Sequence, residues 1–108
     1  MQDKIDGLRA MLEPASVAII GASDDPARIG GRPLRYMRDG GFSGALYPVN
    51  PNRSEVQGMP AFSSILEVPE AVDCAIIAVP AKIVTGTIED CAGMGVKSVI
   101  VFSAGFAE

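Results

Sequence analysis

The feature that most limits the fold of this chain is an unbroken apolar run that ends at a glycine. Residues 17–20 read VAII and are followed by Gly21, and a loop then runs to the paired glycines Gly30 and Gly31. A short apolar run before a turn is typical of a strand that is covered on both faces. Pro33 stands where proline favours the first turn of a helix. The sequence therefore predicts a buried strand, a loop and a helix.

Apolar runs further along the chain predict the remaining strands. The strong ones cover residues 45–49, 74–79 and 96–102, and a weaker run at 56–62 is expected to form a short edge strand. The alternation of strands with helical segments predicts an α/β fold with a mainly parallel sheet. Because crossovers are right-handed, we expect a doubly wound, Rossmann-like, three-layer αβα arrangement with strand order 3-2-1-4-5.

Helices are expected on both sides of this sheet. One follows the glycine loop and ends at residues 40–41, and another covers residues 81–94. Ser64 and Glu67 stand at capping-box spacing and predict a single helical turn, and residues 1–14 are expected to be a lead-in helix. The residues predicted to face the core from the two longer helices are Leu34, Met37, Val84, Ile88 and Cys91.

Composition restricts the class of protein. The 108 residues are 48% hydrophobic and 20% charged, which favours one globular domain over residues 1–108. The net charge of -4 gives no attraction to nucleic acid or to an anionic membrane. No apolar run approaches the roughly 20 residues that span a bilayer, and the first residues lack the pattern of a signal peptide. We expect a cytoplasmic protein with no nucleic-acid or membrane partner.

The chain contains no histidine. Serine and cysteine triads, the commonest zinc sites and phosphohistidine chemistry are therefore excluded within these residues. Cys74 and Cys91 have no CxxC spacing and are expected to be small buried apolar residues. We predict no catalytic residue and no metal ligand here, so the segment should bind and orient a ligand.

The glycine loop is the first candidate binding segment. Its backbone N-H groups and the dipole of the following helix could face a diphosphate, with glycines allowing a tight turn and close approach. The spacing is not GxGxxG, so an ordinary strand-to-helix turn is the alternative. Asp24 and Asp25 are expected to point to solvent or to cap a turn. The candidate contacts are Gly21, Ala22, Ser23 and Gly30.

The strand over residues 45–49 ends in Asn50, Pro51 and, two residues later, Arg53. A nicotinamide site would carry a carboxylate here to bind the ribose hydroxyls, whereas a guanidinium suits a phosphate on that sugar. Coenzyme A is therefore favoured over NAD as the ligand. The alternative interpretation is a solvated turn with an arginine that has no ligand.

Two other strand ends could complete a groove. Val79 with Pro80, and Ser103 with Ala104, follow the strands that flank the expected switch point, where small and apolar residues could line a pantetheine arm. The alternative is ordinary strand termination. The chain stops soon after its last strand, so we expect a fragment whose open strand edge favours self-association into a homo-oligomer.

Five blocks carry a resemblance to a known family: SVAIIGAS, YPVNPNRSEVQG, SSILEVPEAVD, CAIIAVPAKIV and GVKSVIVFSAGFAE. In this order, from about Leu8 to Glu108, they resemble the amino-terminal CoA-binding domain of NDP-forming acyl-CoA synthetases, relatives of the alpha subunit of succinyl-CoA synthetase. The resemblance implies a larger acid-thiol ligase that joins an acid to CoA using ATP, or runs in reverse, through an acyl phosphate and a phosphorylated histidine in a following domain.

The resemblance also implies roles and partners. The phosphate loop maps to residues 21–23, the adenosine-phosphate contact to Arg53, and the pantetheine lining to residues 79–80 and 103–104. ATP, ADP and Mg are expected only in downstream ligase domains or a partner subunit. Two rival hypotheses remain: a stand-alone or regulatory CoA-binding module, including one fused to a protein acetyltransferase, and a nicotinamide-dependent oxidoreductase.

Overall fold

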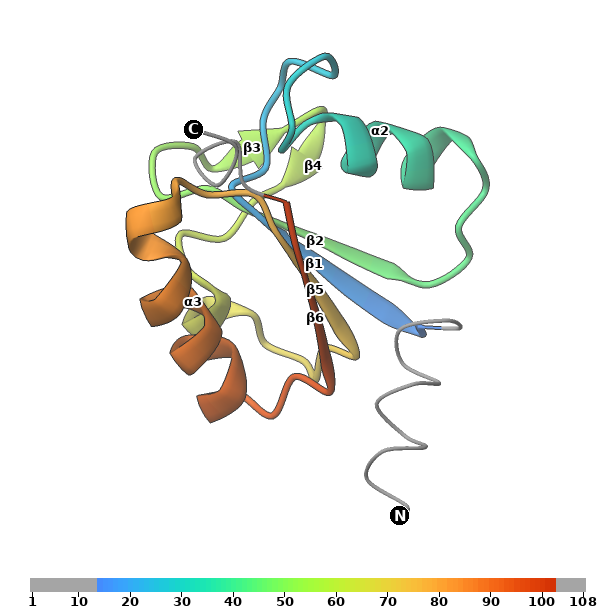
Figure 1. Cartoon of the computed structure of the whole chain (residues 1–108). Helices are drawn as coiled ribbons and strands as arrows, with labels where there is room; N and C mark the ends of the chain where they lie inside the picture. Colours follow the sequence, from blue (N-terminus) through green and yellow to red (C-terminus); the bar gives the residue numbers. More distant parts are fainter. Residues whose placement is uncertain (1–13, 103–108) are drawn as a thin grey trace.

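The computed structural model describes residues 14–102, and its centre is a four-stranded parallel sheet (Figure 1). The strands are β1 (Ser16–Ile20), β2 (Ala45–Val49), β5 (Cys74–Ile77) and β6 (Ser98–Val101). They lie in the order β2-β1-β5-β6, and every neighbouring pair is parallel. The four strong strands and their relative order are confirmed. Ser103, Ala104 and nearly all of the predicted lead-in helix lie outside the described residues.

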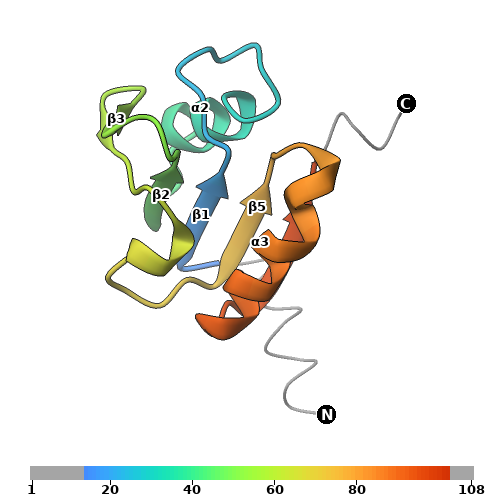
Figure 2. The same cartoon turned by 90° about the vertical axis from the view of Figure 1, so that its left-hand side faces the viewer.

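Helices cover both faces of the sheet, which confirms the three-layer αβα arrangement (Figures 1 and 2). One face carries α2 (Arg32–Asp39) and a small hairpin of β3 (Glu55–Val56) and β4 (Met59–Pro60). The other face carries α3 (Ala81–Gly93) and the single turn η1 (Ile65–Glu67). The predicted helical turn is confirmed, and the Ser64 hydroxyl caps it by accepting the N-H of Leu66. Among residues 14–102 the reciprocal contact from Glu67 that would complete a capping box is absent.

The core is two apolar clusters separated by the sheet. Along β1, Val17 and Ile19 face the α2 layer, while Ala18 and Ile20 face the α3 layer. This alternation explains why the first strand is apolar throughout, because both of its faces are buried. Both cysteines are free and buried, as predicted. Among residues 14–102, no helix has the length and hydropathy needed to cross a membrane.

The core-facing residues of the helices are mostly as predicted, with one correction. Leu34, Val84 and Cys91 are buried and Met37 is partly buried against the α2 cluster. Ile88 is instead 39% exposed. At 3.6 residues per turn, Ile88 lies about 40° around the helix from Val84, whereas Cys91 lies about 20° to the other side. Ile88 therefore stands at the rim of the buried stripe.

The predicted edge strand over residues 56–62 is wrong in detail. The segment forms the antiparallel β3-β4 hairpin, and only one parallel bridge, Val49 to Phe62, joins its end to β2. To continue this parallel ladder toward the N-terminus, positions 48 and 60 would have to donate backbone N-H groups, and both positions are proline. Neither proline has an N-H group to donate, so the ladder stops after one bridge. The third strand of the predicted order is reduced to this single contact.

Candidate functional site

A cavity of about 770 Å³ opens where the carboxyl ends of β1, β2 and β5 meet. In a parallel α/β sheet, this edge is where ligands bind. The glycine loop after β1, the turn after β2 and the start of α3 form its wall. Eight of the eleven predicted binding residues line the cavity: Gly21, Ala22, Ser23, Gly30, Asn50, Pro51, Val79 and Pro80.

The glycine loop folds tightly upon itself. Gly21 has a φ of 89°, and a Cβ atom there would lie 2.2 Å from the carbonyl oxygen of Ala78. A Cβ atom on Gly30 would lie 1.8 Å from the carbonyl oxygen of Gly21. Any side chain at either position would therefore collide with backbone. The tight turn predicted at Gly21 is confirmed. At Gly30 the space left by the missing side chain brings the end of the loop against its beginning, and close approach to a ligand stays a prediction.

Some N-H groups of the loop are already paired, whereas others are available to a ligand. Those of Gly21 and Ala22 both donate to the carbonyl oxygen of Val49, at 3.0 and 3.1 Å, so they join the loop to β2. Those of Ile29 and Gly30, which line the cavity, donate to no acceptor within residues 14–102. Unpaired N-H groups at the entrance to a helix are suited to bind an anion. Among the loop residues that line the cavity, the available donors thus come from the second half of the loop.

The two aspartates of the loop have separate structural roles. Asp25 caps a turn: its Oδ1 accepts the N-H of Ala27 at 2.9 Å, and its own N-H donates to Ser23 Oγ at 3.1 Å. Asp24 Oδ1 accepts the N-H of Gln57 at 2.7 Å, and its Oδ2 pairs with Arg53. The turn-capping role predicted for this pair is confirmed for Asp25. Asp24 instead links the loop to the β2–β4 region.

Asn50 connects the loop to the turn after β2. Its Nδ2 group donates to the carbonyl oxygen of Ala22 at 2.9 Å, and its Oδ1 accepts the N-H of Asn52 at 2.7 Å. An asparagine that binds the N-H two residues ahead fixes a tight turn. Asn50 therefore sets the shape of the cavity wall through backbone contacts, while Pro51 and Asn52 line both this cavity and the neighbouring one.

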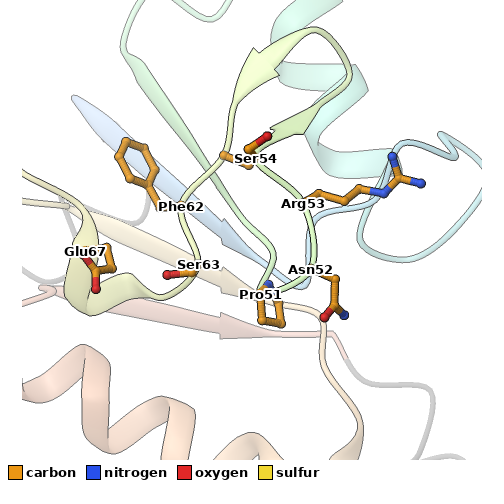
Figure 3. A pocket seen from close by; sticks show the side chains of 8 residues that line it. Pro51, Asn52, Arg53, Ser54, Phe62, Ser63 and Glu67 are labelled. Atoms are coloured by element: carbon orange, nitrogen blue, oxygen red, sulfur yellow. The ribbon is translucent and has the colours of Figure 1, made fainter.

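Arg53 lies beside the main cavity and lines a second hollow of about 760 Å³ (Figure 3). Its side chain is 57% exposed and extends toward the glycine loop, where Nη1 pairs with Asp24 Oδ2. An exposed ion pair of this kind adds little stability. A guanidinium carries five N-H donors, so this contact leaves several of them available to a ligand. The structure thus places Arg53, the cation predicted after β2, next to the glycine loop.

Several residues at or near the cavity are not among the predicted binding residues, and three of them bear on the site. Ile29 and Ile83 line it although their exposed fractions are 42% and 46%, and each is an apolar residue in an otherwise polar or helical surface segment. That mismatch is a signal that could have identified them. Gln57 lies in the β3-β4 turn and contacts the glycine loop. No local pattern predicts that long-range contact.

Comparison with known proteins identifies the family. Residues 15–108 match the model of a family described as a CoA binding domain. The chain belongs to this CoA-binding domain family. The match begins beside β1 and covers the entire glycine loop, the β2 turn and the carboxyl end of β5, so it includes all the walls of the cavity.

Two curated relatives of this CoA-binding domain are named as ligases. The chain is 43% identical to acetate-CoA ligase [ADP-forming] II of Archaeoglobus fulgidus over 96% of its own length and 16% of the relative. It is 38% identical to 4-hydroxybutyrate-CoA ligase [ADP-forming] of Nitrosopumilus maritimus, over 91% of the chain and 14% of the relative.

A solved structure gives the same result. The apo form of dinucleotide forming acetyl-coenzyme A synthetase 1 from Ca. Korarchaeum cryptofilum superposes with a TM-score of 0.86 at 40% identity. The match covers 93% of this chain and 22% of the synthetase. The CoA-binding domain therefore spans less than a quarter of each of these relatives.

Proposed function

We propose that the chain binds coenzyme A in the cavity at the carboxyl ends of β1, β2 and β5, as the CoA-binding part of a larger ADP-forming acyl-CoA ligase. The observation that carries the proposal is that unpaired loop N-H groups line the cavity and the Arg53 guanidinium lies beside it, in a domain of the CoA-binding family. Both groups are complementary to an anionic ligand that bears several phosphates.

The glycine loop is proposed to bind the diphosphate. The N-H groups of Ile29 and Gly30 supply donors, and the Ser23 hydroxyl can add one, because its recorded contact uses only its acceptor capacity. Gly21 and Ala22 contribute close backbone approach, since their N-H groups already bind Val49. Arg28, which also lines the cavity, adds positive charge at its mouth.

The turn after β2 is proposed to bind the adenosine. Asn50 and Pro51 shape the wall, and Arg53 would donate to the phosphate on the ribose. This phosphate distinguishes CoA from NAD, whose ribose hydroxyls call for a carboxylate acceptor. Asp24 is the nearest carboxylate to Arg53, but it already accepts from that guanidinium and from the N-H of Gln57.

The opposite wall is proposed to hold the pantetheine arm. Val79 and Pro80 at the end of β5 and Ile83 at the start of α3 form an apolar surface on the cavity, and the resemblance adds Ser103 and Ala104. An extended and mostly apolar arm needs such a surface with few polar partners. The thiol at its end would then be presented to an acyl phosphate made by other ligase domains.

The wider ligase is part of the proposal. The catalytic histidine, ATP, ADP and Mg would belong to downstream domains or to a partner subunit, and the location would be cytoplasmic. The chain is about equally similar to ligases named for acetate and for 4-hydroxybutyrate, at 43% and 38% identity. This similarity supports a division of labour in which the domain binds CoA and another part of the enzyme selects the acid.

Calorimetric titration of the purified chain tests the proposal. CoA should bind at a single site, and dephospho-CoA, which lacks the ribose phosphate, should bind about tenfold or more weakly, because it loses a charge-assisted hydrogen bond. NADH should bind more weakly than CoA. Absence of CoA binding, or tighter binding of NADH, would refute the proposal.

A further inference from the structure

The hairpin between β3 and β4 makes an unexpected set of contacts with the glycine loop. All of them come from Gln57, the residue at its tip. Gln57 Nε2 donates to the carbonyl oxygen of Ser23 at 2.9 Å and to that of Gly31 at 3.0 Å. These two carbonyls lie near the beginning and at the end of the loop. One side-chain amide thus bridges the two ends of the proposed diphosphate-binding segment.

The backbone of Gln57 is anchored as well. Its N-H donates to Asp24 Oδ1 at 2.7 Å, and its carbonyl oxygen accepts from Arg38 Nη1 at 2.7 Å. The first contact adds a third point on the loop, and the second reaches α2, the helix that the loop enters. Gln57 therefore connects the hairpin, the loop and the helix through four hydrogen bonds.

The conformation of Gln57 is one that glutamine rarely adopts. Its φ is 50°, the only positive value at a non-glycine residue within residues 14–102, and the next residue, Gly58, has a φ of 78°. Two-residue hairpin turns with positive φ at both positions strongly favour asparagine or glycine at the first. A glutamine here costs roughly 1–2 kcal/mol of backbone strain. The turn alone therefore gives no reason for this side chain.

The orientation of the amide is fixed by its partners. Rotating it by half a turn would put Oε1 against two carbonyl oxygens, so the donor group must face the loop. Oε1 is buried and has no donor among the described residues. An unpaired buried acceptor is itself unfavourable. The orientation of the amide therefore favours the two hydrogen bonds from Nε2 to the loop, at the cost of leaving Oε1 unpaired.

We propose that Gln57 is a positioning residue that holds the two ends of the glycine loop together, so that the N-H groups of Ile29 and Gly30 face the diphosphate. The inference rests on the proposed CoA-binding function. Gln57 does not line the cavity, so its effect on the ligand is indirect and passes through the carbonyls of Ser23 and Gly31.

Two variants of the full chain test this role. Gln57→Asn suits the turn better than glutamine but is one methylene too short to bridge the carbonyls, whereas Gln57→Met keeps the length without any donor. Both should bind CoA and dephospho-CoA about tenfold more weakly, because two hydrogen bonds to the loop are lost. Thermal unfolding of Gln57→Asn should match or exceed that of the wild type, which separates loop position from fold stability.

Hydrogen exchange of the free protein provides a readout without ligand. The loop amides of Ser23 and Gly31, which bind Gly30 and Arg28 within the loop, should exchange about tenfold faster in both variants, while amides of β1 keep their protection. Affinity within twofold of the wild type in both variants would overturn the inference. If the wild type does not bind CoA, the ligand proposal fails, and unchanged loop exchange then overturns the role of Gln57 by itself.

Discussion

Arg53 is the single residue on which the proposed preference for CoA over NAD depends most. The sequence predicted a cation after β2, and the structure places it next to the glycine loop, in an ion pair with Asp24. That pairing could not be predicted, because the two residues are far apart in sequence and lie in polar loops without periodicity. The same limit explains why Gln57 was missed. Gly21 and Pro51 were predicted from the strand ends just before them, and Gly30 from the glycine pair before the helix.

Replacing Arg53 tests its contact with the ribose phosphate. Arg53→Glu should weaken CoA binding by about 1–3 kcal/mol, since a charge-assisted hydrogen bond is lost and a repulsive charge is added. Dephospho-CoA should be affected less. Arg35→Glu, on the exposed face of α2, changes the net charge equally and should leave both affinities nearly unchanged. Equal CoA affinity of Arg53→Glu and wild type would contradict the assignment.

The buried thiol of Cys91 is expected to make the free energy of unfolding depend on pH in the alkaline range. Burial, with a smaller contribution from the charge of Asp90, raises the pKa of the Cys91 thiol from 9.0 to about 11. Between these values the unfolded chain releases the proton while the folded protein retains it. The contribution of the protonated Cys91 thiol to the free energy of unfolding is therefore fully present below pH 9 and is lost as pH rises toward 11. The slope is at most about 1.4 kcal/mol per pH unit.

Urea unfolding at several pH values measures this dependence. The free energy of unfolding should fall less steeply from pH 9 to 11 in Cys91→Ala than in the wild type. The pKa of Cys74 is also raised, mainly by burial, but that thiol is common to both proteins. Parallel curves for the two proteins would show that Cys91 does not titrate differently in the folded and unfolded states.

At the scale of elements, the sequence predicts strands and helices well where burial dictates a pattern. Buried parallel strands such as β1 and β5 must be apolar on both faces, so their sequences are distinctive. The segment from Glu55 to Phe62 is different, because whether it forms an edge strand depends on which residues of β2 it would pair with. The parallel ladder stops after the Val49–Phe62 bridge because positions 48 and 60, which would donate the next N-H groups, are both proline, and apolar content does not reveal that register.

The glycine loop offers a test at this scale. Gly30→Ala would place a Cβ atom 1.8 Å from the carbonyl oxygen of Gly21, so the loop must move and CoA affinity should fall by about tenfold or more. Gly86→Ala, in α3 with no atom near the added carbon, is the matched control and should stabilise the helix by about 1 kcal/mol. CoA affinity retained in Gly30→Ala would exclude the loop as the phosphate contact.

For the whole molecule, net charge and local charge make opposite predictions about an anionic ligand. The chain carries a net charge of -4, which repels CoA at long range, whereas the cavity is flanked by Arg28 and Arg53. The Debye length falls from about 30 Å at 0.01 M salt to about 3 Å at 1 M. If local cations dominate, CoA affinity should decrease as salt is added. Calorimetry showing tighter binding at high salt would mean that net repulsion dominates.

An amide NMR titration of the whole chain with CoA locates the ligand without any mutation. If CoA binds in the proposed cavity, saturable shift changes are expected in three separate segments: residues 21–31, residues 50–53 and residues 79–83. These segments meet only at the cavity where β1, β2 and β5 end. Shifts confined to the outer surfaces of α2 or α3, or no saturable shifts, would contradict binding in this cavity.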